Sequence, residues 1–320
     1  MNIVYDLFHL SLISAVPLLV VAIGAMISER SGVVNIALEG LMLMGAFIGI
    51  AVIKTLEDSG TSMSIQWILL IGIIVGGVVG GVFALLHAYA AISMKSNQII
   101  SATALNLFAP AFAIFTARTI QNGQQIPFTS VFKMSEIPLL SKIPFIGDLF
   151  FKDIFLSFYV GIFILIFVYF FIYKTRFGLR LRSCGENPHA ADSLGINIYK
   201  MRYIAVCLSG VLAGMGGVMF VTSTSTEFNA SVAGYGFLAL AVLIFGNWKP
   251  FRIMFAALFF GFMRTIAAAH GMIPFLENLR IPGEFYNMIP YITTLIVLSF
   301  ASRKSQAPKA AGQVYDQGRR

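Results

Sequence analysis

Long runs of apolar residues are the feature that most limits what this chain can fold into. We place such runs near 7–27, 36–54, 67–92, 99–117, 154–173, 203–222, 232–247, 253–270 and 288–301. A run of about 18–25 residues crosses a hydrocarbon layer as a helix. A water-soluble core cannot hide these runs, because 58% of the residues are hydrophobic and only 11% are charged, against about 45–50% and about 25% in soluble domains. The sequence therefore predicts an all-α, polytopic transmembrane helical bundle.

Two of these runs are short for a full crossing, which takes about 20 residues. The runs at 232–247 and 288–301 are expected to be tilted, broken or re-entrant, so we predict about 8–10 spans. We assign residues 1–301 to one transmembrane domain. The remaining 302–320 form a basic tail that is rich in polar residues and is expected to be disordered.

The positions of Lys and Arg predict the orientation of the bundle. They are concentrated after the run at 154–173 and in the tail, at Lys174, Arg176, Arg180, Arg182, Lys200, Arg202, Arg303, Lys304, Lys309, Arg319 and Arg320. Cytoplasmic loops carry such an excess, so both regions are expected inside. Alternation then places Arg30 and Lys95 inside and the segment 118–153 outside. The N-terminus is predicted outside and the C-terminus inside.

The orientation rule also explains the net charge of +8, which in a soluble protein would suggest nucleic-acid binding. We therefore expect the lipid bilayer as the surrounding medium and no nucleic-acid partner. The two cysteines and four histidines lack metal-ligand spacing, so no metal site is predicted. The spans contain no paired carboxylates and no Ser/His or Ser/Lys arrangement that stands out, so we assign no catalytic residue.

Glycine is concentrated in two of the runs. The residues are Gly72, Gly76, Gly77, Gly80 and Gly81 in the first, and Gly210, Gly214, Gly216 and Gly217 in the second. Glycines four apart lie on one helix face and let neighbouring backbones approach closely. We interpret both clusters as helix-packing surfaces rather than as ligand sites.

Polar residues in or between apolar runs indicate where transport or chemistry takes place, because an unpaired charge in hydrocarbon costs at least about 2.5–3.5 kcal/mol. The segment from Ser28 to Gly40 is polar and would interrupt a regular helix. Non-helical backbone at membrane depth is tolerated only where protein buries it or water reaches it. The segment is therefore either a pathway or gating element, with Asn35 and Glu39 on one helix face, or an ordinary cytoplasmic loop with Asn35 as a helix cap.

Other polar or aromatic candidates for a substrate pathway are Asn106, Phe237, Arg264 and the hydroxyl-rich turn Thr222–Thr226. Arg264 should face the bundle interior, and on charge alone we expect it to pair with Glu39. Phe237 and Tyr235 are suited to stacking on a planar ring. For Trp248, at a helix end, an interface anchor is the better interpretation.

The longest basic loop contains a second cluster, which reads as a short helix outside the membrane. Asn187 is a suitable helix cap, Pro188 suits the first helical position and Gly195 suits the stop. Ala190 and Ala191 leave an open face that a partner can cover. Such defined caps favour a docking helix over a plain connector.

At these two clusters the sequence resembles the permease family of branched-chain amino acid and simple-sugar ABC importers. Within that family it is most similar to the nucleoside (guanosine-type) branch, and the run from Ser28 to Gly40, with Gly45-Ala46-Phe47, carries that likeness. The family's cytoplasmic coupling segment, here 185–197, is matched at Gly185, Glu186, Asn187, Pro188, Ala190, Ala191, Gly195 and Ile196. Further matches are Gly236-Phe237 and Ile289-Pro290-Tyr291, whereas Arg264 lies where a smaller or uncharged residue is expected.

The resemblance implies a transport subunit rather than an enzyme, in the bacterial cytoplasmic (inner) membrane. This chain would pair with a second, homologous permease. A separate ABC ATPase subunit with two nucleotide-binding modules would dock on the coupling segment, and a substrate-binding lipoprotein would deliver the cargo. The sequence has no Gly-x-x-x-x-Gly-Lys-Ser/Thr phosphate loop. We therefore expect no cofactor on this chain, with ATP and magnesium bound by the partner ATPase.

The implied function is nucleoside import by ATP-driven alternating access. A sugar or a branched-chain amino acid is the alternative cargo within the same family. An ion-coupled secondary carrier is a further alternative, although it would need membrane-embedded carboxylates, of which only Glu39 lies away from the loops.

Overall fold

Seven helices that the structure describes are long and apolar enough to cross a membrane. The structure is a computed structural model, and it describes residues 3–121, 123–129, 131–136, 141, 143, 146–273, 276, 281–301 and 306–318. The seven long helices are α1 (Ile3–Arg30), α2 (Leu38–Asp58), α3 (Ile65–Ala88, extended by a π-helical turn Tyr89–Ser93), α4 (Gln98–Gln121), α6 (Leu156–Lys174), α9 (Ile198–Thr224) and α11 (Pro250–Ala268). The predicted polytopic helical bundle is confirmed.

The two runs predicted to be short form short helices, α10 (Tyr235–Phe245) and α14 (Ile289–Ala301). The described residues also form the helices α5 (Ile146–Phe150), α7 (Arg176–Glu186), α8 (Pro188–Ser193) and α13 (Gly283–Asn287) and a 3-10 helix at His270–Met272. The same residues contain four short strands, β1 (Ile126–Pro127), β2 (Lys133–Glu136), β3 (Lys152–Phe155) and β4 (Glu227–Phe228), which pair antiparallel as β1–β4 and β2–β3.

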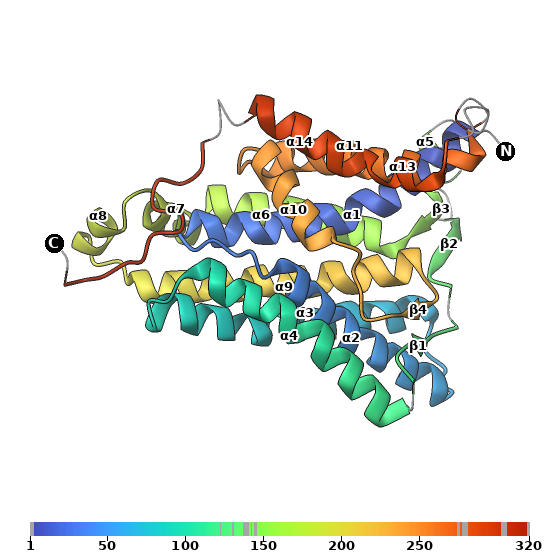
Figure 1. Cartoon of the computed structure of the whole chain (residues 1–320), viewed down its shortest axis with the longest axis horizontal. Coiled ribbons are helices and arrows are strands. Elements are labelled where there is room, and N and C mark those ends of the chain that lie inside the picture. The colour runs from blue at the N-terminus through green and yellow to red at the C-terminus, as the bar shows by residue number, and fades with distance from the viewer. Residues whose placement is uncertain are drawn as a thin grey trace.

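The bundle has two different ends (Figure 1). One end, here called the coupling end, carries α7, α8 and residues 306–318. The opposite end, here called the sheet end, carries the four strands. The N-terminal start of α1 lies at the sheet end and the C-terminal residues lie at the coupling end, so the chain crosses from one end to the other overall.

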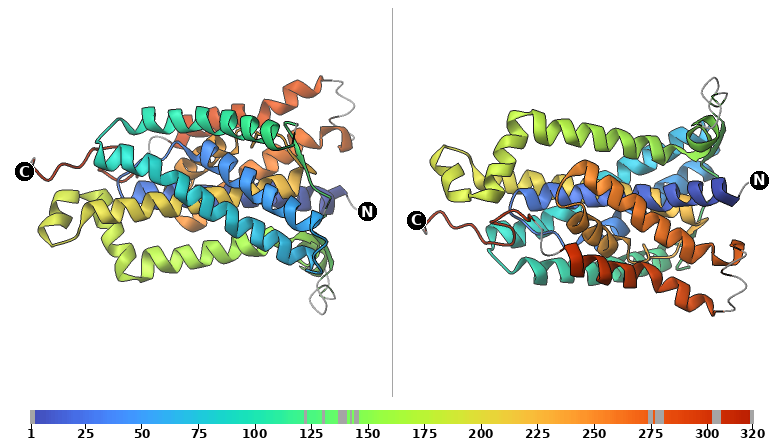
Figure 2. Two further views of the ribbon diagram at one scale, coloured as in Figure 1. Left: turned by 90° about the horizontal axis from the view of Figure 1, so that it is seen from below. Right: turned by 90° about the horizontal axis from the view of Figure 1, so that it is seen from above.

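Helices α1 and α9 lie at the centre of the bundle, and α4 and α6 lie at opposite edges (Figure 2). Most of α1, α2 and α9 is buried inside the chain, whereas most of α4 is exposed. In a bilayer, the exposed apolar side chains of α4 and α6 are in contact with lipid or with another membrane subunit.

The two glycine clusters form the contact between α3 and α9, the most extensive contact in the bundle. A Cβ atom on Gly214 would collide with the carbonyl oxygen of Gly76 and lie 3.1 Å from the Cα of Gly80. A Cβ atom on Gly45 of α2 would collide with Gly214 itself. The glycines therefore let three helices touch through their backbones, which confirms the predicted packing role.

Candidate functional site

Residues 31–37, between α1 and α2, form a non-helical segment that is largely buried. Side chains of other helices form hydrogen bonds with backbone N–H and carbonyl groups of this segment. The N–H of Val34 donates to Oε1 of Gln98 at 2.8 Å, and the carbonyl oxygen of Val34 is hydrogen-bonded to Nε2 of His87 at 3.2 Å. Backbone groups in a membrane must be paired within the protein, so these two side chains allow the segment to remain non-helical.

Asn35 attaches this segment to α9 in the interior of the bundle. Its side chain is fully buried, donates to Oγ of Ser209 on α9 at 2.9 Å and accepts from the N–H of Ala37 at 3.1 Å. Ser209 lies about 16 Å along α9 from the first residue, at about 1.5 Å per residue. Asn35 therefore belongs to a buried, membrane-depth element and not to a solvated loop. The expectation that Asn35 and Glu39 share a helix face is wrong, because Asn35 precedes the first turn of α2.

The start of α2 is held by a residue of α4. The amide of Asn106 donates from Nδ2 to the carbonyl oxygen of Ile36 at 2.9 Å and accepts at Oδ1 from the N–H of Gly40 at 2.8 Å. The first N–H groups of a helix have no partner within the helix. Asn106 thus supplies, from a different helix, the acceptor that a capping residue normally gives, and α2 can begin inside the bundle.

Glu39 joins this start of α2 to the start of α10. Its Oε1 accepts from the N–H of Gly234 at 2.9 Å and its Oε2 accepts from the N–H of Gly236 at 2.7 Å. A Cβ atom on Gly236 would collide with the backbone of Glu39, so only glycine permits this approach. The carboxylate also lies at the positive end of the α10 dipole. We call residues 38–40 together with 234–236 the α2–α10 junction.

The predicted pairing of Arg264 with Glu39 is wrong. The two carboxylate oxygens of Glu39 accept from backbone amides of α10. The guanidinium carbon of Arg264, on α11, lies instead 5.4 Å from the centre of the Tyr235 ring, a cation–π arrangement. Two amides at a helix start offer a carboxylate better-directed donors than a flexible arginine on a neighbouring helix.

The structure nevertheless brings four of the five predicted pathway residues to one place. Glu39 and Asn106 hold the α2–α10 junction, Arg264 contacts its tyrosine, and Phe237 follows it directly. The Phe237 side chain is 51% exposed. Tyr291 of α14 is 53% exposed, and its hydroxyl lies near Gly234. The junction therefore adjoins an accessible aromatic surface. The Asn35 side chain is bound to Ser209 of α9 instead.

A cavity of about 450 Å³ lies beside the extended segment, towards the coupling end. It is lined by Val34, Ile36, Ser96, Asn97, Gln98, Ile99, Gly312 and Val314. The segment that leads to the α2–α10 junction thus has space along one side. In the described residues, no group of three or more His, Cys, Asp or Glu side chains is placed to hold a metal ion.

At the coupling end, the short helix predicted within 185–197 is confirmed. Asn187 caps α8 by accepting from the N–H of Ala190 at 3.0 Å, and Pro188 occupies the first turn. Gly195 ends the turn in the left-handed region at φ +78°, with open space around it. Leu194 is 82% exposed, so this short helix presents an apolar side chain to whatever lies beyond the bundle.

The coupling segment is in direct contact with the end of α1. A Cβ atom on Gly185 would collide with the carbonyl oxygen of Arg30 and lie 3.3 Å from the nitrogen of Gly32. Arg30 also reaches Glu186 at 3.8 Å. The end of α7, which leads directly into α8, therefore touches the start of the buried 31–37 segment. Burial raises the pKa of the neighbouring Cys184 thiol to about 11, so this thiol stays protonated at neutral pH.

Residues 306–318, expected to be disordered, lie over this contact. The N–H of Ala310 donates to the carbonyl oxygen of Gly185 at 2.9 Å, and the N–H of Gly312 donates to that of Gly32 at 3.0 Å. Nη1 of the buried Arg202 donates to the carbonyl oxygen of Gln313 at 3.0 Å. Backbone groups of this segment thus bind other parts of the chain, and its polar side-chain composition gave no sign of these contacts.

We expect deletion of residues 306–320 to lower the midpoint of thermal unfolding of the purified protein by several degrees. The deletion removes the hydrogen bonds to Gly185, Gly32 and Arg202 together with the buried Tyr315 ring, with a combined effect on the order of 2–4 kcal/mol. Deletion of residues 317–320 alone keeps these contacts and serves as the control. Equal midpoints for the two shortened chains would show that the observed contacts do not stabilise the bundle.

The sequence did not predict which residues form hydrogen bonds with the predicted site residues and with the 31–37 segment. Ser209, Gln98 and His87 pair with the 31–37 segment, and their signal was their polar character within apolar surroundings. Trp248 was expected to be an interface anchor, but it is 5% exposed and its indole N–H donates to Oε2 of Glu29 at 2.7 Å. The partner carboxylate of Trp248 is more than two hundred residues away in sequence, and no local pattern indicates it.

Comparison with known proteins gives four findings. The family described as branched-chain amino acid transport system / permease component matches residues 8–298. The nucleoside ABC transporter permease protein NupC of Lactococcus lactis subsp. cremoris (strain MG1363) is 42% identical over 305 residues, which cover 95% of this chain and 94% of NupC. The guanosine ABC transporter permease protein NupQ of Bacillus subtilis (strain 168) is 38% identical over 312 residues, which cover 97% and 96% of the two chains. No solved structure matches.

Proposed function

The chain belongs to the permease-component family of branched-chain amino acid transport systems, and from this premise we propose that it is the membrane-spanning permease subunit of an ABC importer that carries nucleosides into the cytoplasm. The observation that carries the proposal is similarity over almost the whole chain to two permeases named for nucleoside and guanosine transport. The similarity extends through the α2–α10 junction and the coupling segment alike, so it concerns the complete transport subunit.

For the assembly, we propose a second homologous permease, a separate ATPase subunit with two nucleotide-binding modules, and a substrate-binding lipoprotein. The coupling end faces the cytoplasm in this proposal. It carries Arg30, Lys95, Lys174, Arg176, Arg180, Arg182, Lys200, Arg202 and Lys249, the excess that cytoplasmic loops show. The membrane is the bacterial cytoplasmic membrane, and ATP and magnesium bind to the ATPase subunit.

For the mechanism, we propose that movement of α8 reaches the substrate route through three successive contacts. Gly185 presses on the end of α1, the 31–37 segment continues from there, and Glu39 links the start of α2 to α10. Two helices that begin within the bundle can tilt about that point without breaking hydrogen bonds along their length. The exposed Phe237 and Tyr291 then line the route between this chain and its partner permease.

A Gly195→Pro variant is expected to retain at least about tenfold less ATPase subunit in co-purification, because proline cannot adopt φ +78° and removes the N–H that donates to Asp192 at 2.8 Å. Gly60→Pro is a matched control at the sheet end. Gly60 also has a positive φ, +62°, donates its N–H to a helix carbonyl, that of Glu57, and has open space around it. Equal ATPase retention by both variants would contradict the docking role of α8.

The cargo is tested by uptake of tritiated guanosine and uridine into cells, with glucose and leucine as competitors. Nucleoside import that glucose and leucine do not inhibit, and that ceases when the ATPase gene is deleted, is the expected result. Uptake that persists without the ATPase would favour an ion-coupled carrier. Inhibition by glucose or leucine would reassign the cargo within the family.

A further inference from the structure

The hydroxyl-rich turn Thr222–Thr226 at the sheet end has no part in the proposed route through the α2–α10 junction. It covers the last turn of α9 and the start of the link to β4. Its hydroxyl protons are largely committed to backbone oxygens: Thr222 donates to Val218 at 2.8 Å, Ser223 to Met219 at 2.6 Å, Thr224 to Phe220 at 2.7 Å and Ser225 to Glu227 at 2.8 Å. The hydroxyl oxygens of Thr222, Ser223 and Thr224 therefore remain as acceptors, whereas that of Ser225 already accepts from the N–H of Glu227 at 3.2 Å.

This turn lines a cavity of about 480 Å³, here called the hydroxyl cavity. Its other walls are apolar and come from the linking segments, at Phe128, Val131, Phe132 and Phe155. The pairing of β1 with β4, together with the 3.0 Å bond from the N–H of Phe128 to the carbonyl oxygen of Thr226, fixes these walls to the turn. The volume lies within the range of roughly 300–1,000 Å³ that is usual for small-molecule sites.

We propose that the hydroxyl cavity binds the cargo nucleoside as a neutral molecule at the sheet end, before it enters the bundle. The inference rests on the proposed function and adds a binding site to it. None of the residues that line the cavity carries a charge, so a charged ligand would lose its hydration without compensation. A nucleoside is neutral, its sugar hydroxyls and base N–H groups donate to oxygen acceptors, and its base offers a flat apolar face.

Access to the cavity agrees with this assignment. Val131, Thr224 and Thr226 are exposed side chains of its lining, whereas Phe132 and Thr222 are buried and form its inner part. The hydroxyl of Thr226 makes no hydrogen bond to the residues that the structure describes, so it can both donate and accept. The site is thus open towards the end of the bundle at which cargo would arrive in the proposed orientation.

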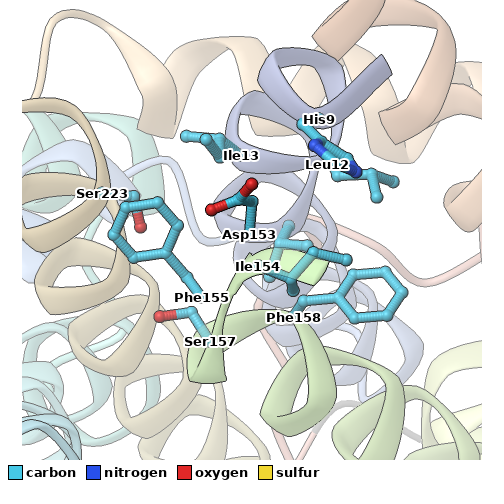
Figure 3. Close-up of a pocket in the computed structure, with 10 residues that line it drawn as sticks. His9, Leu12, Ile13, Asp153, Ile154, Phe155, Ser157, Phe158 and Ser223 are labelled. Carbon is cyan, nitrogen blue, oxygen red and sulfur yellow. The ribbon is translucent and has the colours of Figure 1, made fainter. Parts of the chain in front are cut away.

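A smaller cavity (Figure 3) shares Phe155 and Ser223 with the hydroxyl cavity, so the two adjoin at these side chains. Its lining is mostly apolar, and its polar groups come from four elements: His9 of α1, Asp153 of β3, Ser157 of α6 and Ser223 of α9. Oγ of Ser157 is buried and has no hydrogen-bond partner in the described part of the chain. The charge of Asp153, at the same place, is paired with Lys133 at 3.2 Å. The Ser157 hydroxyl is therefore a further neutral polar group, and it lines the cavity that adjoins the hydroxyl cavity at Phe155 and Ser223.

The test measures binding of tritiated guanosine and uridine to the purified permease–ATPase complex in lipid nanodiscs, without the lipoprotein. A Thr224→Val/Thr226→Val double variant is expected to bind about tenfold more weakly, because two acceptor oxygens are replaced by methyl groups of the same shape. A Val131→Trp variant, which places an indole in the cavity from an exposed position, is expected to abolish binding.

Thr61→Val is the matched control. Thr61 is an exposed threonine at the sheet end that also donates to a backbone carbonyl, that of Leu56 at 2.7 Å, but it does not line the cavity. Its variant should bind as the wild type does. Each complex is first checked for monodisperse elution and for retention of the ATPase subunit.

Three outcomes would overturn the proposal. In the first, the wild-type complex transports nucleosides but binds none without the lipoprotein. In the second, the cavity variants bind nucleosides as tightly as the control variant does. In the third, the cavity variants weaken lipoprotein docking alone and leave nucleoside affinity unchanged. A wild-type complex that transports no nucleoside would instead refute the proposed function, so the two failures are distinguishable.

Discussion

Replacing Glu39 with alanine is expected to leave the chain inserted in the membrane and to reduce nucleoside uptake by about a hundredfold. The change leaves the N–H groups of Gly234 and Gly236 without acceptors at membrane depth. Each unpaired group costs about 1–3 kcal/mol, and the two together correspond to a factor of about a hundred or more in the population of the joined state. The measurement is the initial rate of tritiated guanosine uptake, normalised to the amount of chain in the membrane.

Two further variants decide how Glu39 acts. Glu39→Gln keeps one acceptor oxygen, but its amide N–H₂ would face the second N–H, so we expect a loss of about tenfold. Glu57→Ala is the matched control, because Glu57 also accepts from a backbone amide, that of Thr129 at 3.0 Å, but does so at the exposed sheet end. It should reduce uptake by less than about threefold, since exposed hydrogen bonds contribute little. Normal uptake by Glu39→Ala would refute the role assigned to the α2–α10 junction.

Features that depend on neighbours in the sequence were predictable. The caps of α8 follow from Asn187, Pro188 and Gly195, which lie within one short stretch. The glycine surfaces follow from a spacing of four residues on one helix. The short helices α10 and α14 follow from the lengths of their apolar runs. In each case the residues that determine the feature lie close together in the sequence, so a local pattern is enough to predict it.

Features that depend on distant partners were not predictable. Glu39 could be recognised as an unusual carboxylate, but its partners are backbone amides about two hundred residues away, and backbone amides carry no sequence signal. Charge therefore pointed to Arg264, which contacts an aromatic ring instead. For the same reason, residues 306–318 looked disordered. Their stability comes from Gly32, Gly185 and Arg202, and composition does not show those contacts.

The close approach of α2, α3 and α9 makes the fold depend on a glycine at position 214. A Gly214→Val variant is expected to yield no folded protein. Its side chain would collide with Gly76 of α3, and Gly214 itself lies where a Cβ on Gly45 would be. Both obstacles are backbone atoms, which cannot rotate away as a flexible side chain does. The helices must therefore separate, at a cost of at least about 3 kcal/mol, since overpacking by a few methyl groups already costs about 1–3 kcal/mol.

The measurement is the yield of monodisperse protein in size-exclusion chromatography after extraction in mild detergent. Gly271→Val is the control, because it introduces the same side chain at a glycine with open space around it, and it should elute as the wild type does. Gly77→Val is an intermediate case, since the nearest atom to its Cβ is Cγ of Met215 at 2.8 Å, on a flexible side chain that can move. The expected order of yield is therefore Gly271→Val, then Gly77→Val, then Gly214→Val. A folded Gly214→Val protein would show that α9 can move away from α2 and α3 at little cost in free energy. The contact among the three helices would then allow sliding, and the helices would not form a rigid frame for movement of the α2–α10 junction.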